Sequence, residues 1–141
     1  MVLKTKKIFK AEKESVPTVK KFVEGQLLLW DLHEDDIKDI VLACDEACAN
    51  IVMYAYKDDK NNSKKNFSIE LKKRGKIVKI IITDNGKEFN ILNSPPPDIK
   101  QNLKGKREGG FGVFLMKNMM DRIKYKYEEE KNIVKLIKKT I

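Results

Sequence analysis

The sequence predicts an α/β two-layer sandwich in which helices cover one face of a mostly antiparallel or mixed sheet. Two observations support this prediction. Residues 34–56 place their apolar side chains within one helical stripe, and several short segments alternate as half-buried strands do. The expected order is strand, two helices, two strands, a long loop, a helix and two strands, which is typical of helices packed on one side of a sheet. With 141 residues, the chain is predicted to form a single domain, residues 1–141.

The first half of the chain supplies an edge strand and two helices. Residues 4–11 alternate loosely, as an edge strand does. Ser15, with a proline two positions later, is expected to cap a helix that runs to about Trp30, and residues 34–56 form the longest helix. His33 stands just before that helix, where a cap or loop residue is expected.

The second half is predicted to form four strands, a loop and one helix. The loop covers residues 84–108, which show no clear periodicity and include three consecutive prolines. A glycine cluster then opens a helix that ends near Arg122. The strands are expected at residues 67–72, 77–83, 123–128 and 133–139, with tight turns at Arg74-Gly75 and Lys131-Asn132.

The composition favours a cytoplasmic protein with a solvated basic surface. The net charge is +9, from 30 Lys and Arg against 21 Asp and Glu, and most of the excess is Lys scattered along the strands and chain ends. Such a surface would attract an anionic nucleotide or an acidic partner, and a nucleic-acid patch is the alternative interpretation. No signal-peptide core or membrane span is apparent. Cys44 and Cys48 share the apolar helical face and are expected to be buried thiols.

The long helix carries the first group of candidate functional residues. Glu46 and Asn50 are four residues apart, so they share a face, about opposite the centre of the apolar stripe. A carboxylate and a carboxamide one turn apart can hold a hydrated Mg²⁺ ion, and Glu46 can also accept a proton from a nucleophile. The simpler interpretation is a solvated helix face.

Two further motifs follow along the chain. Asp84-Asn85-Gly86 comes directly after an apolar strand, where a carboxylate can accept from the amine of adenine and a glycine lets the backbone pass close to a flat ligand. Gly109-Gly110-Phe111-Gly112 stands at a helix start, where unpaired amides and the helix dipole attract phosphate. A plain turn and a flexible hinge are the respective alternatives. Before the glycines, Lys104, Lys106 and Arg107 can offset the charge of a transferred phosphoryl group.

In this order, the three motifs resemble the N, G1 and G2 boxes of the GHKL, or histidine-kinase-like, ATPase superfamily. The motifs are Glu46-Ala47-Cys48-Ala49-Asn50, Asp84-Asn85-Gly86 and Gly109-Gly110-Phe111-Gly112. The segments 45–52 and 112–121, with the proline-rich loop between them, resemble the anti-sigma-factor serine/threonine kinases of the RsbW and SpoIIAB type. The resemblance covers nearly the whole chain.

This resemblance implies a Bergerat fold that binds ATP and Mg²⁺. Glu46 would be the general base and Asn50 the Mg²⁺ ligand, while Asp84 and Gly86 would contact adenine. Gly109, Gly110 and Gly112, with Arg107, would bind phosphate, and the lid would span about 90–108. The implied activity is phosphorylation of a STAS-type anti-anti-sigma protein, and the implied partners also include a sigma factor and a second copy in a homodimer, with no membrane or direct nucleic-acid contact.

Some features leave alternatives open. The family often carries a hydroxyl residue on the last strand near adenine; Lys135 and Ile137 are expected in that neighbourhood, so no site residue is assigned there. The same motifs would also suit a nucleotide-binding module without transfer activity. A histidine-kinase fragment would use His33, but no dimerising helical hairpin precedes it.

Overall fold

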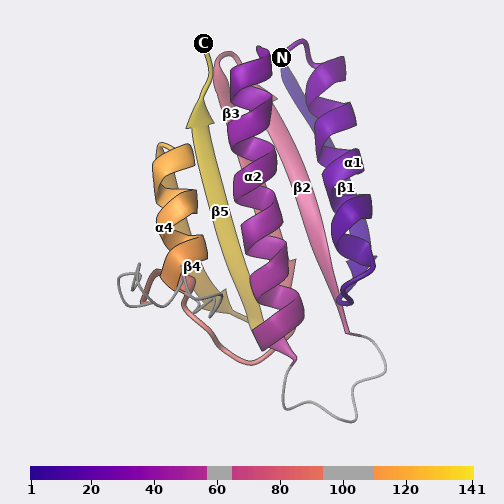
Figure 1. Ribbon diagram of the computed structural model, residues 1–141, viewed down its shortest axis with the longest axis vertical. Coiled ribbons are helices and arrows are strands. Elements are labelled where there is room, and N and C mark those ends of the chain that lie inside the picture. Colours follow the sequence, from indigo (N-terminus) through magenta and orange to yellow (C-terminus); the bar gives the residue numbers. More distant parts are fainter. Residues whose placement is uncertain (57–64, 94–109) are drawn as a thin grey trace, which may run out of the picture.

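The computed structural model describes residues 1–56, 65–93 and 110–141, which form a sheet with helices on one face (Figure 1). The predicted α/β sandwich is confirmed, and every described strand pair is antiparallel rather than mixed. The strand order is β1-β2-β3-β5-β4. The strands are β1 (Val2–Lys10), β2 (Asn66–Arg74), β3 (Ile77–Asp84), β4 (Arg122–Glu128) and β5 (Lys131–Lys139), and the helices are α1 (Ser15–Leu29), α2 (Glu34–Asn50) and α4 (Gly110–Met119).

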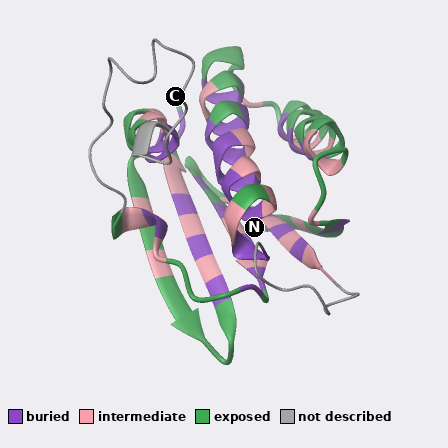
Figure 2. Ribbon diagram, turned by 60° about the horizontal axis from the view of Figure 1, so that its bottom comes forward, coloured by how far each residue is buried: buried purple, intermediate pink, exposed green. Residues whose placement is uncertain are grey.

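The core lies between the sheet and the helices. Buried and more exposed residues alternate along the central strands, as the purple bands in Figure 2 show. This alternation arises because successive side chains of a strand point to opposite faces, and only one face is covered. The residues that point from β2, β3 and β5 into the core are Phe67, Ile69, Leu71, Val78, Ile80, Ile82, Val134 and Leu136.

The helix boundaries confirm one predicted cap and correct another. His33 is the N-cap of α2, and its Nδ1 atom accepts a hydrogen bond from the Asp35 amide at 3.1 Å. Ser15, in contrast, lies inside α1; Glu14 is the N-cap, and its side chain makes no capping bond. The predicted helix 34–56 is divided, because α2 passes into a π-helical turn, η1 (Ile51–Ala55).

The two hairpin turns differ in how well their sequence predicts them. Gly75 adopts a φ of 57° between β2 and β3, as expected of a glycine in a tight turn. The second turn was predicted at Lys131-Asn132, and this is wrong: both residues belong to β5. Glu129 and Glu130 form the turn instead, with φ values of 52° and 61°. Glutamate is an unusual residue for this left-handed conformation, so the sequence gives no turn signal there.

Both cysteines are free and buried, as expected. Burial, and secondarily the charge of Asp45, raises the pKa of Cys44 to about 12. Burial also raises the pKa of Cys48, with Cys44 and Asp45 adding to the effect. The two thiols are therefore protonated packing groups.

No helix in the described ranges is long and apolar enough to cross a membrane.

The left-handed turn between β4 and β5 allows a direct test of the hairpin. We expect the double substitution Glu129→Asn and Glu130→Gly to stabilise the protein by up to about 1 kcal/mol, because Asn-Gly adopts two positive φ angles with less strain. The thermal midpoint should rise by a few degrees. A lower midpoint for this variant would contradict the assigned turn.

Candidate functional site

The candidate site lies where the C-terminal end of α2 meets the end of β3 and the start of α4. Figure 1 shows these three segments together at the lower end of the molecule. Asn50 and Asp84 line one cavity, and Gly112 of α4 lies against Glu46. The structure thus brings together residues from all three predicted motifs, which are far apart in sequence.

Glu46 and Asn50 are buried, with 7% and 8% exposure. Their position opposite the apolar stripe favoured a solvated helix face, and that simpler interpretation is wrong. The start of α4 covers them: a Cβ atom on Gly112 would lie 2.7 Å from Glu46 Oε2 and 3.9 Å from Asn50 Nδ2. A glycine at position 112 therefore leaves space for the Glu46 carboxylate between the two helices.

Asp84 ends β3 with its side chain on the helix side of the sheet, 5% exposed. Its Oδ1 atom accepts hydrogen bonds from the Gly86 amide and from Asn132 Nδ2, both at 2.9 Å. Its Oδ2 atom accepts none from the described residues. Burial raises the pKa of the carboxyl group, while the bonds from Asn132 and Gly86 oppose that rise. Asp84 therefore offers one buried acceptor atom to a ligand.

Gly86 is required by a close backbone approach. A Cβ atom at this position would overlap the backbone carbonyl of Ala55 and lie 2.8 Å from its Cβ atom. The Ala55 carbonyl also accepts a hydrogen bond from the Lys87 amide at 3.0 Å. Ala55 ends the π-helical turn η1, and such turns are frequent at functional sites. Through Ala55, this turn at the end of α2 contacts the segment that follows Asp84.

Asn132 is a central residue of the site that the sequence analysis missed. It pairs with Asp84 across β3 and β5 and is 3% exposed. Its Nδ2 atom donates to Asp84 Oδ1 and, at 2.8 Å, to the Lys87 carbonyl. Its Oδ1 atom accepts from the Phe89 amide at 3.0 Å and from the Tyr125 hydroxyl at 2.6 Å. Asn132 therefore holds both Asp84 and the segment that follows it.

The register explains why this position was not predicted. Lys135 and Ile137 were expected near the adenine pocket, but they pair with Ile81 and Lys79 and point to the other face of the sheet. The sequence predicts a turn at Asn132, whereas this residue is the second of the final strand. An asparagine near the start of that strand is the signal for this site, and it becomes informative only once the pairing with β3 is known.

A cavity of about 30 Å³ lies between these residues. That volume holds about two water molecules, so a purine ring requires lining side chains to move. Phe89 lines the cavity, is 41% exposed and stacks on Tyr54, with ring centroids 6.0 Å apart. The lining residues are Ala47, Asn50, Ile51, Ala55, Ile82, Asp84, Phe89, Ile91, Asn132 and Val134.

Part of the predicted phosphate site lies outside the described residues. Gly110 opens α4, as expected, and Gly112 lies in its first turn. Gly109, Arg107, Lys104 and Lys106 are not among the described residues. Of the predicted lid, residues 90–108, only the first four are described, and Ile91–Asn93 form a short 3₁₀ turn, η2.

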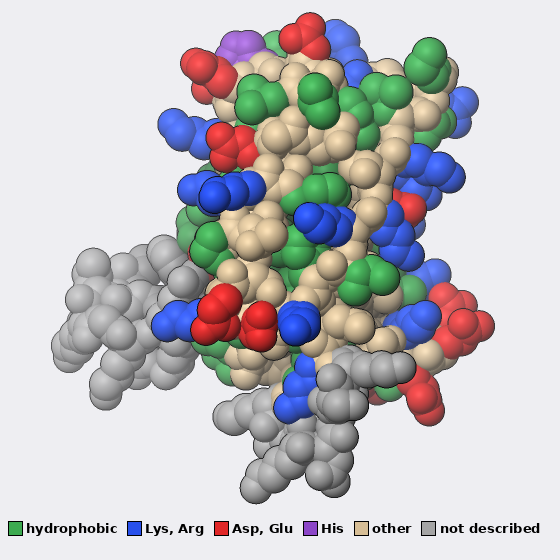
Figure 3. All heavy atoms as spheres, turned by 90° about the vertical axis from the view of Figure 1, so that its right-hand side faces the viewer, with side chains coloured by type: hydrophobic (Ala, Val, Ile, Leu, Met, Phe, Trp, Pro, Cys, Tyr) green, Lys and Arg blue, Asp and Glu red, His purple; other side chains and the backbone are tan. Residues whose placement is uncertain are grey.

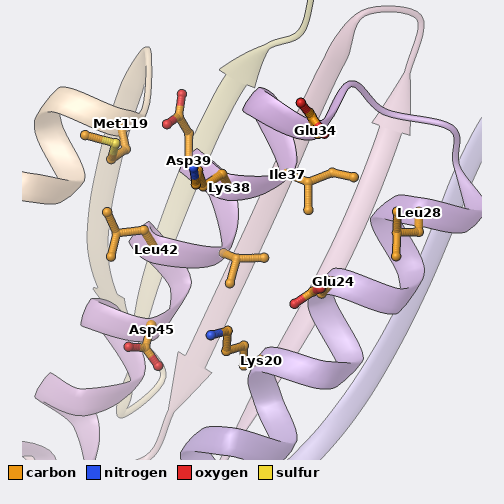
Figure 4. A pocket seen from close by; sticks show the side chains of 11 residues that line it. Lys20, Glu24, Leu28, Glu34, Ile37, Lys38, Asp39, Leu42, Asp45 and Met119 are labelled. Atoms are coloured by element: carbon orange, nitrogen blue, oxygen red, sulfur yellow. The ribbon is translucent and has the colours of Figure 1, made fainter.

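A larger hollow of about 660 Å³ lies on the outer side of the helices and contains none of the predicted site residues (Figure 4). Apolar side chains such as Leu28, Ile37 and Leu42 line it between α1 and α2. Four acidic side chains and two basic ones surround them, which disfavours an anionic nucleotide. These charged residues are Lys20, Glu24, Glu34, Lys38, Asp39 and Asp45.

Comparison with known proteins identifies the family of the chain. The model of the histidine kinase-like ATPase domain matches residues 9–138. Serine-protein kinases RsbW from Staphylococcus aureus strains MSSA476 and JH9 are 32% identical over 117 residues, covering 80% of this chain and 72% of theirs. The solved structure of the RsbU and RsbW domains of a Mycobacterium tuberculosis protein has the same fold, with a TM-score of 0.67 at 12% identity. That match covers 98% of this chain and 32% of the other.

Removing the Asn132 side chain should loosen the site. We expect Asn132→Ala to lower the free energy of unfolding by about 2–3 kcal/mol, because several buried polar groups lose their partner. The pKa of Asp84 should rise further, since a bond that opposes the rise is lost. Chemical denaturation and the pH titration of Asp84 by NMR measure the two effects.

Asn118→Ala is the matched control. Asn118 donates to the Phe114 carbonyl on an exposed part of α4, so its loss should change stability by less than about 0.5 kcal/mol. Equal effects of the two substitutions would refute the central role of Asn132.

Glycine 86 should tolerate no side chain. We expect Gly86→Ala to destabilise the protein by about 2–4 kcal/mol, because its Cβ atom meets the backbone of Ala55 rather than a flexible side chain. Gly25→Ala is the control: Gly25 lies within α1 with open space around it, so alanine should stabilise by up to about 1 kcal/mol. Urea denaturation should therefore give changes of opposite sign; a stable Gly86→Ala variant would show that the close approach is not required.

Proposed function

Because the chain belongs to the histidine kinase-like ATPase family, we propose that it is an ATP-dependent protein-serine/threonine kinase that acts as an anti-sigma factor. Its substrate would be a STAS-type anti-anti-sigma protein, and it would also bind a sigma factor. The family match and the RsbW relatives support the kinase class. A homodimer is part of the same proposal.

One observation carries the proposal: a buried carboxylate, Glu46, lies against a glycine at the start of α4. This close approach holds the carboxylate at the start of the helix, away from bulk solvent. The start of a helix attracts the phosphate groups of a nucleotide. The arrangement therefore suits a base held beside a transferred phosphoryl group.

Each residue of the site has a distinct proposed role. Glu46 accepts the proton of the serine or threonine hydroxyl of the substrate protein. The oxygen of that hydroxyl bonds to the γ-phosphorus of ATP, and ADP leaves. Asp84 Oδ2, to which none of the described residues donates, accepts a hydrogen bond from the adenine amine. Gly86 lets the backbone approach the ring, and Gly109, Gly110 and Gly112, with Arg107, bind the phosphates.

The residues present also suit a magnesium ion. Mg²⁺ prefers oxygen ligands and keeps several waters, so one amide oxygen together with the phosphates is sufficient protein ligation. Asn50 is the proposed ligand, buried one helical turn from Glu46. When bound, the ion would neutralise charge on the phosphates, while Glu46 and Asp84 perform the roles above.

Nucleotide specificity is the first test. Adenine nucleotides with Mg²⁺ at about 100 times their dissociation constant should stabilise the protein by roughly 2.7 kcal/mol, which raises the thermal midpoint by several degrees. MgGTP should have little effect, because its ring presents a carbonyl to Asp84 instead of an amine. Asp84→Asn should lose the response to MgATP. The absence of a shift with any nucleotide would refute the nucleotide site.

Phosphoryl transfer is the second test. Each STAS-domain protein of the source organism is incubated with the chain and radiolabelled MgATP. We expect Glu46→Gln to keep the MgATP-induced thermal shift and to lose at least about 100-fold in transfer rate, whereas exposed Glu24→Gln remains active. Equal transfer by Glu46→Gln would exclude Glu46 as the base, and no transfer by the wild type would favour a non-catalytic nucleotide-binding module.

A further inference from the structure

The net positive charge of the chain falls on the side of the sheet that the helices leave uncovered. Side chains alternate along each strand, and the buried residues mark the helix side, so the register assigns the others. We call this surface the open face; it comprises every second residue counted from Val2, Asn66, Ile77, Arg122 and Lys131. Twelve Lys and Arg residues and two Glu residues occupy it. The rest of the chain carries nearly equal numbers of the two signs.

Charged and apolar side chains are interspersed on the open face, and lysines lie beside the isoleucines on the central strands. The two outer strands contribute a basic column each, Lys4, Lys6 and Lys10 from β1 and Arg122, Lys124 and Lys126 from β4. The central strands β3 and β5 contribute four isoleucines, which are partly exposed: Ile77, Ile81, Ile133 and Ile137. In Figure 3 this side of the sheet is seen in profile along the right-hand margin, where blue Lys and Arg side chains predominate.

Folding alone does not explain this arrangement. Lys4, Lys72 and Lys79 lie directly opposite one another on three adjacent strands, and like charges in such positions destabilise a sheet. Both glutamates already lie near a lysine of the same face: Glu70 is 3.5 Å from Lys72, and Glu128 is 2.9 Å from Lys126. The remaining cations therefore present a strong positive field to solvent.

We propose that the open face is a docking surface for an acidic protein. Protein–protein interfaces combine apolar and polar surface, and the isoleucines and lysines of the open face offer both. Nine residues of strand by five strands give a surface of roughly 20 by 30 Å, which is similar to one side of a standard interface. An acidic surface on the partner would speed association and select against basic proteins.

The chemistry of the open face disfavours three other binding partners: a single-stranded nucleic acid, an anionic bilayer and a second copy of the chain. Single-stranded nucleic acids stack on aromatic side chains, and the aromatic residues of the described strands, Phe9, Phe67, Tyr125 and Tyr127, all point to the helix side. A planar anionic bilayer would rest on the long lysine side chains and leave the shorter isoleucines in water. A second copy would oppose one strongly positive face to another.

The docking surface and the candidate active site lie on opposite sides of the sheet. The strand residues that line the cavity, including Asp84, Asn132 and Val134, all point to the helix side. A protein on the open face therefore leaves the cavity uncovered. This partner is distinct from the protein that offers its hydroxyl to Glu46, and both can bind at once. The inference uses the proposed function only to choose candidate partners.

Charge reversal tests the proposal with a matched control. The face variant carries Lys4→Glu, Lys79→Glu and Lys124→Glu; each new carboxylate lies opposite Lys72 or Lys135, so the sheet should keep or gain stability. The control carries Lys20→Glu, Lys21→Glu and Lys38→Glu, an equal charge change at exposed positions of the helices. Thermal midpoints and the MgATP-induced shift verify that both variants are folded with an intact nucleotide site.

Binding is measured by calorimetry with each purified sigma factor and STAS-domain protein of the source organism. The other probes are a 30-base-pair DNA duplex and phosphatidylserine-containing vesicles. We expect an acidic protein to bind the wild type and the control equally, to bind the face variant at least 100-fold more weakly, and to bind less tightly as salt is raised. That protein should not compete with the phosphorylated substrate.

Three outcomes would overturn the docking surface: equal affinity of the two variants, no protein bound by the wild type, or binding through this face only to DNA, to vesicles or to a second copy. Phosphoryl transfer is assayed separately on the same variants. If phosphoryl transfer is intact but the acidic protein binds both variants equally, the docking proposal alone is refuted. If transfer is absent, the proposed kinase activity is refuted.

Discussion

The antiparallel pairing of β3 with β5 is the constraint on which the rest of the structure depends. Its register places Ile80 opposite Leu136 in the core and Asp84 opposite Asn132 at the end of the same row. A slip of one residue would turn Asp84 to the uncovered side and bring lysines into the core. The register that buries the apolar side chains therefore also aims the carboxylate into the layer between sheet and helices.

Helix α2 connects this sheet to the second half of the site. Its apolar stripe packs on the strands, while Glu46 and Asn50 are covered by α4. The large core that the same helix forms with the sheet fixes the position of this polar pair. The π-helical turn that follows brings the Ala55 carbonyl to the segment after Asp84. The continuous stretch of α2 and η1 therefore positions Glu46, Asn50 and this carbonyl.

Charge is distributed as unevenly as polarity. Helix α2 is rich in acidic residues, and three of them, Glu34, Asp35 and Asp36, stand in its first turn, where the helix dipole favours negative charge. The uncovered side of the sheet is strongly basic. Among the solvent-facing side chains of helices α1, α2 and α4, in contrast, acidic and basic residues are nearly balanced, so the net positive charge of the composition is concentrated on one layer.

The sequence alone determined the order of the elements, the apolar stripe of α2 and the three motifs, because periodicity, turn chemistry and short motifs are local properties of the chain. It placed Glu46, Asp84 and the helix start at Gly110 correctly on their elements. The tertiary structure decided what local pattern could not: that α4 buries Glu46 and Asn50, that Asn132 rather than Lys135 or Ile137 meets Asp84, and that scattered lysines share one face. The physical reason is that strand register and helix packing arise from contacts between distant segments, which the spacing of residues along the chain does not specify.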